Sequence, residues 1–197
     1  MNKLMGFFEL QNSSLPTIPW KQYTQGTQLD ENILWTIRTA VFKGDDLNLP
    51  RSIGKNAQSS IAFAEKMLKE IADNGIVIYY PYFIADKSGT LNIFNDYSII
   101  EAVTADLWNL VTFSDRNITL RISIDNTIDF YNGDISFLTN DELRDLVINI
   151  PKTKSLFRDY LTEGKSILLE WSFAYNCDVN QNRIGEKYLV FYEARTV

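Results

Sequence analysis

Two acidic side chains, Glu170 and Glu193, lie in segments whose patterns predict neighbouring strands. Residues 166–175 and 187–197 are rich in β-branched and aromatic residues, and a polar loop joins them as in a hairpin. Side chains alternate between the two faces of a strand, so Glu193 shares a face with Arg195. Two close carboxylates repel unless a cation lies between them. The spacing predicts that Glu170 and Glu193 hold Mg²⁺; the alternative is two polar residues on the wet face of a sheet.

A second polar cluster begins at Arg38, which we expect near the end of a helix, and continues into the loop that follows. That loop contributes Arg51 and three other charged residues, Asp45, Asp46 and Lys55. Cations beside exposed backbone amides can bind an anion such as a phosphate. The alternative interpretation is a solvated loop held by surface ion pairs.

The composition excludes several kinds of chemistry. The chain has 197 residues and no histidine, which excludes a Ser–His–Asp triad, a histidine metal site and a phosphohistidine within it. Its net charge of −6 does not favour binding to a nucleic-acid backbone, which needs a concentrated basic face. The single cysteine, Cys177, excludes an internal disulfide. Because no apolar run reaches the roughly 18 residues of a membrane span, we expect no membrane association and a cytoplasmic location.

The periodicity predicts an α+β fold with a largely antiparallel sheet and flanking helices, in one compact domain. We expect an extended arm over 1–28, a helical part over 29–75, and mixed sheet and helices over 76–197. The expected helices cover 30–42, 57–73, a short segment that Thr139 or Asn140 begins, and 151–161. The expected strands cover 118–124, 127–131, 166–175 and 187–197, with a strand followed by a helix over 98–113. We also expect a hairpin over 76–94, with its turn at 86–89.

Five short strings occur in the order of a known family's signatures. They are Ile37-Arg38-Thr39-Ala40-Val41-Phe42-Lys43-Gly44-Asp45, Ser88-Gly89-Thr90-Leu91, Ile100-Glu101-Ala102-Val103, Leu169-Glu170-Trp171 and Glu193-Ala194-Arg195-Thr196. In this order they resemble the nucleotide-binding domain of the pyruvate phosphate dikinase and phosphoenolpyruvate synthase family.

The resemblance implies an ATP-grasp-like fold that binds ATP with Mg²⁺ and acts as a phosphotransferase component with a partner. It implies phosphate contacts from Arg38 and Arg195, with Arg51 added from the loop cluster. Glu101 would lie in the nucleotide cleft, and Glu170 and Glu193 would hold the metal. The chain is shorter than a complete family domain, so we expect the ATP-covering lobe to be shortened or absent.

The chain also departs from the family pattern. Glu193 stands where the family has Gln, and Ala105-Asp106-Leu107-Trp108 replaces a Gly-Leu-Gly run. These departures favour a second hypothesis, a non-catalytic interaction or regulatory module that binds a partner protein or self-associates. In that case we expect an exposed aromatic patch, made of Trp20, Tyr23, Tyr80 and Tyr82.

Overall fold

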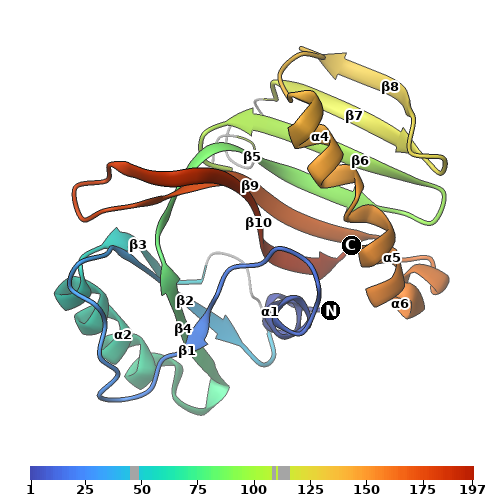
Figure 1. The fold of residues 1–197 in the computed structure, drawn as a ribbon. Coiled ribbons are helices and arrows are strands. Elements are labelled where there is room, and N and C mark those ends of the chain that lie inside the picture. Colours follow the sequence, from blue (N-terminus) through green and yellow to red (C-terminus); the bar gives the residue numbers. More distant parts are fainter. Residues whose placement is uncertain (45–48, 108–109, 111–115) are drawn as a thin grey trace. The chain divides into compact units, whose positions relative to one another are not determined.

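The computed structural model of the chain describes residues 1–44, 49–107, 110 and 116–197 (Figure 1). The fold is α+β with two antiparallel sheets, as the sequence predicts. Contacts divide the chain into two compact units. Unit 1 comprises 1–17, 85–174 and 187–197, and unit 2 comprises 18–84 and 175–186. These boundaries do not follow the sections 1–28, 29–75 and 76–197, since strands β5, β9 and β10 each continue from one unit into the other.

Unit 2 contains a four-stranded sheet in the order β1-β4-β2-β3, with helix α2 packed against it. Its elements are β1 (Lys21–Gln22), β2 (Trp35–Val41), β3 (Arg51–Lys55), α2 (Ala57–Ile71), the 3₁₀ turn η1 (Ala72–Asn74) and β4 (Gly75–Pro81). Helix α2 confirms the prediction over 57–73, and the Asn56 side chain caps it by accepting from Ser59 N. The apolar face of α2 packs on Ile37 and Val77 in the core of this unit.

The helix expected over 30–42 is wrong, because most of that segment is the central strand β2. Strand β2 pairs with β4 on one side and β3 on the other, and residues on both of its faces are buried. A strand buried on both faces has no clean two-residue alternation, so its apolar spacing can imitate a helix. Asp30 does not cap a helix; its side chain accepts a hydrogen bond from Asn32 N in a turn.

Unit 1 contains a six-stranded sheet in the order β10-β9-β5-β6-β7-β8. Its strands are β5 (Phe83–Ile93), β6 (Tyr97–Thr104), β7 (Ile118–Ser123), β8 (Ile128–Gly133), β9 (Ile167–Cys177) and β10 (Arg183–Thr196). Its helices are α1 (Lys3–Gln11), α4 (Asn140–Val147), α5 (Ile150–Leu156) and α6 (Arg158–Thr162). Helices α4 to α6 cover one face of the sheet, where Trp171 and Phe173 pack with Leu146 and Phe157 (Figure 1).

The hairpin expected over 76–94 is also wrong. Strands β4 and β5 belong to different sheets, and the presumed turn at 86–89 lies within β5, which pairs with β6. The glycine of this segment serves close packing. A Cβ at Gly89 would lie 1.9 Å from Glu101 O and 2.4 Å from the Trp171 ring. Only glycine lets the backbone and the indole approach so closely.

Most of the remaining predictions of elements are confirmed. Thr139 begins α4 in a capping box with Glu142, and Pro151 lies in the first turn of α5. Strands β6 to β10 fall where the patterns place them, whereas residues 3–11 form helix α1 where an extended arm is expected. The helix expected after β6 falls largely on 108–115, outside the described residues. No helix in the described part of the chain is long and apolar enough to cross a membrane.

Candidate functional site

The face of the unit 1 sheet opposite α4 to α6 carries a row of polar side chains. Trp171 and Phe173 of β9 point into the helix-covered core, so Glu170 and Ser172 lie on the other face. Ser172 Oγ lies 2.8 Å from Ser88 Oγ of the neighbouring strand β5, and both serines are buried. We call this the polar face, defined by Ser88, Thr90, Glu101, Glu170 and Ser172.

Glu101 joins the polar face from strand β6. It is the register partner of Thr90, whose hydroxyl donates to Glu101 Oε2 at 3.4 Å. Thr90 lies two residues from Ser88 and therefore on the same face. Arg116 Nε lies 2.5 Å from the other oxygen, Glu101 Oε1. The carboxylate that the resemblance assigns to a nucleotide cleft thus shares a sheet face with Glu170.

Three of the predicted site residues meet at Arg195. Its guanidinium nitrogens lie 3.9 Å from Glu170 Oε1 and 3.9 Å from Glu193 Oε1. The exposed fraction of the side chain is 28% for Arg195, 14% for Glu170 and 1% for Glu193. Lys3 Nζ of helix α1 lies 3.3 Å from Glu193 Oε1. The guanidinium of Arg195 therefore lies beside both carboxylates of the predicted acidic pair.

The guanidinium of Arg195 is only loosely held. Its Nε is buried and makes no hydrogen bond within the described residues. Both contacts of 3.9 Å exceed hydrogen-bonding range, so they are ion pairs without shared hydrogens. An arginine offers five N–H donors in a planar fork that matches a carboxylate or a phosphate. Arg195 therefore retains donors for an oxyanion.

The same cluster contains the two carboxylates that the sequence predicts as Mg²⁺ ligands. Glu193 Oε1 is buried, and its ion-pair partners are Lys3 Nζ at 3.3 Å and Arg195 Nη1 at 3.9 Å. Mg²⁺ is commonly held by one or two carboxylates, with water and substrate phosphate as its other ligands. No group of three or more acidic, histidine or cysteine side chains in the described ranges could hold a metal. A site here would rest on Glu170 and Glu193 alone.

Tyr192 adjoins the polar face from β10. Burial raises the pKa of Tyr192 well above its ordinary value, and the negative charge of Glu170 raises it further. Ser172 is its hydrogen-bond partner, which opposes these effects. The phenol therefore stays neutral and can act as a hydrogen-bond donor at neutral pH.

The two remaining predicted residues, Arg38 and Arg51, lie in unit 2. They are register partners on the neighbouring strands β2 and β3, and the Arg51 residue is exposed. Arg38 lies within a strand and Arg51 begins one, so neither has the helix-end or loop setting that we expect. Lys55 ends β3, whereas Asp45 and Asp46 fall outside the described residues.

The aromatic patch expected for an interaction module is not formed. Trp20, Tyr23 and Tyr80 are buried, with 4%, 1% and 5% of their surface exposed. Tyr23 packs in the core of unit 2 against the ring of Tyr79. Trp20 and Tyr23 looked available because the sequence predicts an extended arm over 1–28, but both side chains are buried.

Sequence patterns missed Lys3, Ser88 and Tyr192. The alternation that places Ser172 beside Glu170 was visible, but the pairing of β9 with β5 was not, because the hairpin prediction assigned the 86–89 segment to a turn. No local pattern connects Lys3 with a strand near the other end of the chain. Comparison with protein-family models gives no match, and comparison with curated protein sequences also gives none.

Proposed function

We propose that the chain binds a nucleotide with Mg²⁺ through the cluster of Glu170, Glu193 and Arg195. In this proposal Arg195 binds the phosphates, the two carboxylates hold the metal, and Glu101 contributes from the same sheet face. The observation that carries the proposal is the state of Arg195, which is partly exposed, has a buried Nε without a hydrogen bond, and has carboxylates at 3.9 Å. Such a guanidinium is already positioned for an oxyanion.

The charges of the cluster make the metal necessary for the nucleotide. Arg195 and Lys3 carry two positive charges, and Glu170 and Glu193 carry two negative charges, so the cluster is close to neutral. A polyphosphate alone would be repelled by the two carboxylates. Mg²⁺ would neutralise them and bridge to the phosphate oxygens, while the guanidinium would turn towards the phosphates. We therefore expect binding of ATP with Mg²⁺ and little binding of free ATP.

Thermal unfolding with ATP, in the presence and absence of Mg²⁺, tests the proposal. A ligand at one hundred times its dissociation constant stabilises a protein by about 2.7 kcal/mol, which raises the melting temperature by about 5–10 °C in a chain of this size. We expect this rise when Mg-ATP is compared with Mg²⁺ alone, and we expect its loss in Glu170→Ala and Arg195→Gln.

The matched controls are Glu163→Gln and Arg158→Gln. The original side chains are 60% and 82% exposed, and they lie at the two ends of α6 rather than on a strand of the sheet. Both should retain the full rise. An equal rise with free ATP, or no rise with any nucleotide, would contradict the proposal. The proposal does not require Arg38 or Arg51, which lie in unit 2.

A second candidate function, an interaction module without catalysis, is supported by a different observation. Among the described residues of unit 1, the aromatic side chains with the highest exposed fractions lie on strand β8, where Phe130 and Tyr131 are 56% and 55% exposed. This surface shares no residue with the polar face, so the two functions can coexist.

A further inference from the structure

The two edge strands of the unit 1 sheet differ in how far other segments pair with them. Strand β10 forms one edge, and the N-terminal segment of the same chain covers part of it. Phe191 N donates to Pro16 O at 2.7 Å, and Thr17 forms a parallel bridge with Phe191. Strand β8 forms the other edge, and within the described residues no strand pairs with its outer side. The described residues thus cover part of one edge and leave the other open.

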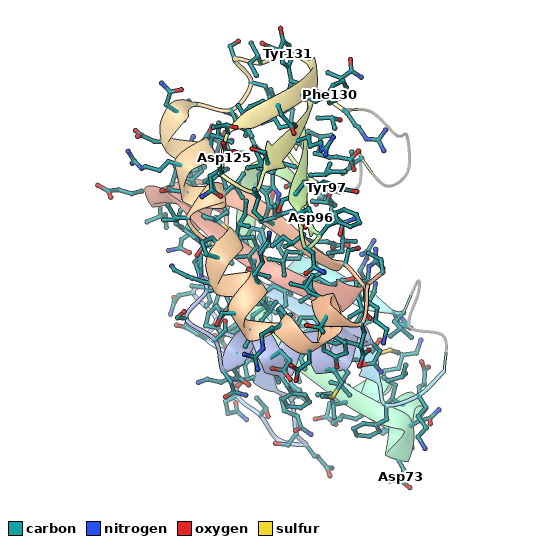
Figure 2. All side chains as sticks on the ribbon, turned by 90° about the vertical axis from the view of Figure 1, so that its right-hand side faces the viewer. Asp73, Asp96, Tyr97, Asp125, Phe130 and Tyr131 are labelled. Carbon is teal, nitrogen blue, oxygen red and sulfur yellow. The ribbon has the colours of Figure 1, made fainter. Side chains whose placement is uncertain are left out.

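Strand β8 carries few of the features that protect an open edge. All six of its residues are exposed. Proteins usually block such edges with lysine, proline, or cover from a helix or loop. The strand contains neither lysine nor proline, and its one charged side chain, Asp129, is directed to Arg121 of β7 at 3.7 Å. Figure 2 shows Phe130 and Tyr131 at the outer margin of the molecule.

The register identifies which backbone groups of β8 point outward. Asp134 N donates to Asn117 O at 2.8 Å, which makes these two residues a hydrogen-bonded pair. Such pairs alternate along an antiparallel ladder. Asn132 and Phe130 therefore direct their N–H and C=O groups towards β7, and Tyr131 directs its own away from the sheet.

We propose that β8 is a self-association surface, on which a second copy of this chain pairs its own β8 in antiparallel orientation. The pairing is centred on Tyr131, whose outward N–H and C=O groups bond those of Tyr131 in the second copy. In this register Tyr131, whose backbone N–H and C=O groups point outward near the middle of β8, lies opposite Tyr131 of the second copy. The six-stranded sheets of the two copies then form one continuous sheet across a two-fold axis.

The charge and shape of β8 favour a copy of itself as the occupant. Centring on Tyr131 places Asp129 opposite Gly133, so the carboxylates of the two copies do not face each other. It places Phe130 opposite Asn132, while the two Tyr131 rings form a cross-strand aromatic pair. Phe130 and Tyr131 lie on opposite faces, so the tyrosine pair forms on one face of the joined sheet and the two Phe130–Asn132 pairs form on the other. The pairing of two identical β8 strands therefore avoids facing carboxylates and forms one aromatic pair.

A contact of one strand pair and one aromatic pair is small. Its buried area falls below the roughly 1,200 Å² of stable complexes, so the dimer dissociates on dilution. Sedimentation velocity over a wide range of protein concentration tests this directly. We expect a shift from the 22.7 kDa monomer towards a species of about 45.4 kDa, twice the chain mass, as the concentration rises.

Tyr131→Pro is the diagnostic variant, because it removes the outward N–H at the centre of the proposed pairing. Proline is tolerated at an edge-strand position whose N–H faces solvent, so pairing with β7 survives. Phe130→Lys, which places a cation on the edge, is the second variant. We expect each to raise the dissociation constant at least about tenfold, with circular dichroism and melting temperature close to those of the wild type.

Ile148→Lys is the matched control, since Ile148 is 50% exposed in the same unit but lies outside β8. It should dimerise like the wild type. A wild-type chain that stays monomeric at the highest concentration would overturn the proposal. That result would favour a different partner at this edge. A dimer that Tyr131→Pro and Phe130→Lys leave unchanged would also overturn the proposal.

Discussion

Glu142 Oε2 lies 2.7 Å from Lys87 Nζ, and the other oxygen of the same carboxylate lies 2.7 Å from Lys187 Nζ. The carboxylate also accepts from Thr139 N as part of the capping box of α4. Lys87 belongs to β5 and Lys187 to β10, so one side chain, of which 5% is exposed, ties a helix start to two strands of unit 1. A paired, buried carboxylate of this kind makes stability depend on pH.

Acid should weaken the fold through Glu142. Burial by itself would raise the pKa of Glu142, but hydrogen bonds from Lys187 and Lys87 outweigh it and lower the pKa from 4.5 to about 2. The native state thus favours the charged form, so the stabilisation is complete above pH 4.5 and is lost as the pH falls towards 2. The contribution is about 3 kcal/mol. We expect the unfolding free energies of the wild type and Glu142→Gln to converge in urea titrations as the pH falls. A difference that does not change with pH would contradict this.

Sequence reasoning succeeded for features set by interactions between residues close in the chain, and it failed for features set by residues far apart in the chain. The capping box at Thr139 and the alternation around Glu170 are local, and both are confirmed. The segment 30–42 failed because its neighbours on both sides bury it, which removes the two-residue period. The hairpin at 76–94 failed because the chain leaves one sheet and enters another near residue 82. Nothing in a local pattern records a change of sheet.

The candidate site was predictable only in part, for the same reason. Glu170, Glu193 and Arg195 lie on consecutive strands, so alternation and a short loop suffice to bring them together. Lys3 reaches Glu193 because helix α1 packs directly on β10, where a Cβ at Gly6 would lie 1.9 Å from Ala194 O. That contact joins the two ends of the chain, and it depends on a glycine whose role is visible only in three dimensions.

Gly89→Ala should destabilise the chain although Gly89 lies in an ordinary strand rather than a turn. The added methyl group would meet Glu101 O and the Trp171 ring, one of them backbone and the other a buried indole that cannot move aside. Overpacking of this kind costs about 3 kcal/mol. Chemical denaturation measures the loss. A change in unfolding free energy within about 0.5 kcal/mol, which is typical of surface substitutions, would contradict the close packing at Gly89.

Alkaline pH should weaken unit 2 through Tyr23. Burial raises the pKa of Tyr23 to about 12, and the hydrogen bond to Glu65 and its negative charge add to the effect. The native state favours the neutral phenol, so the contribution of Tyr23 to stability is present below pH 10 and is lost as the pH rises towards 12. Thermal unfolding of Tyr23→Phe should fall less steeply with pH above 10 than that of the wild type. Identical slopes would contradict the assignment.

Replacing Arg195 should create affinity for Mg²⁺ in the absence of any nucleotide. In the wild type the guanidinium lies 3.9 Å from both Glu170 and Glu193, where it partly neutralises the pair and competes with a metal ion. Arg195→Gln removes that charge, while Lys3 remains beside Glu193. Their mutual repulsion then favours a divalent cation. We expect Mg²⁺ alone to raise the melting temperature of Arg195→Gln more than that of the wild type. The double variant Glu170→Gln/Arg195→Gln, which lacks one carboxylate, should lose this gain. An equal Mg²⁺ response in all three proteins would show that the acidic pair does not act as a metal site.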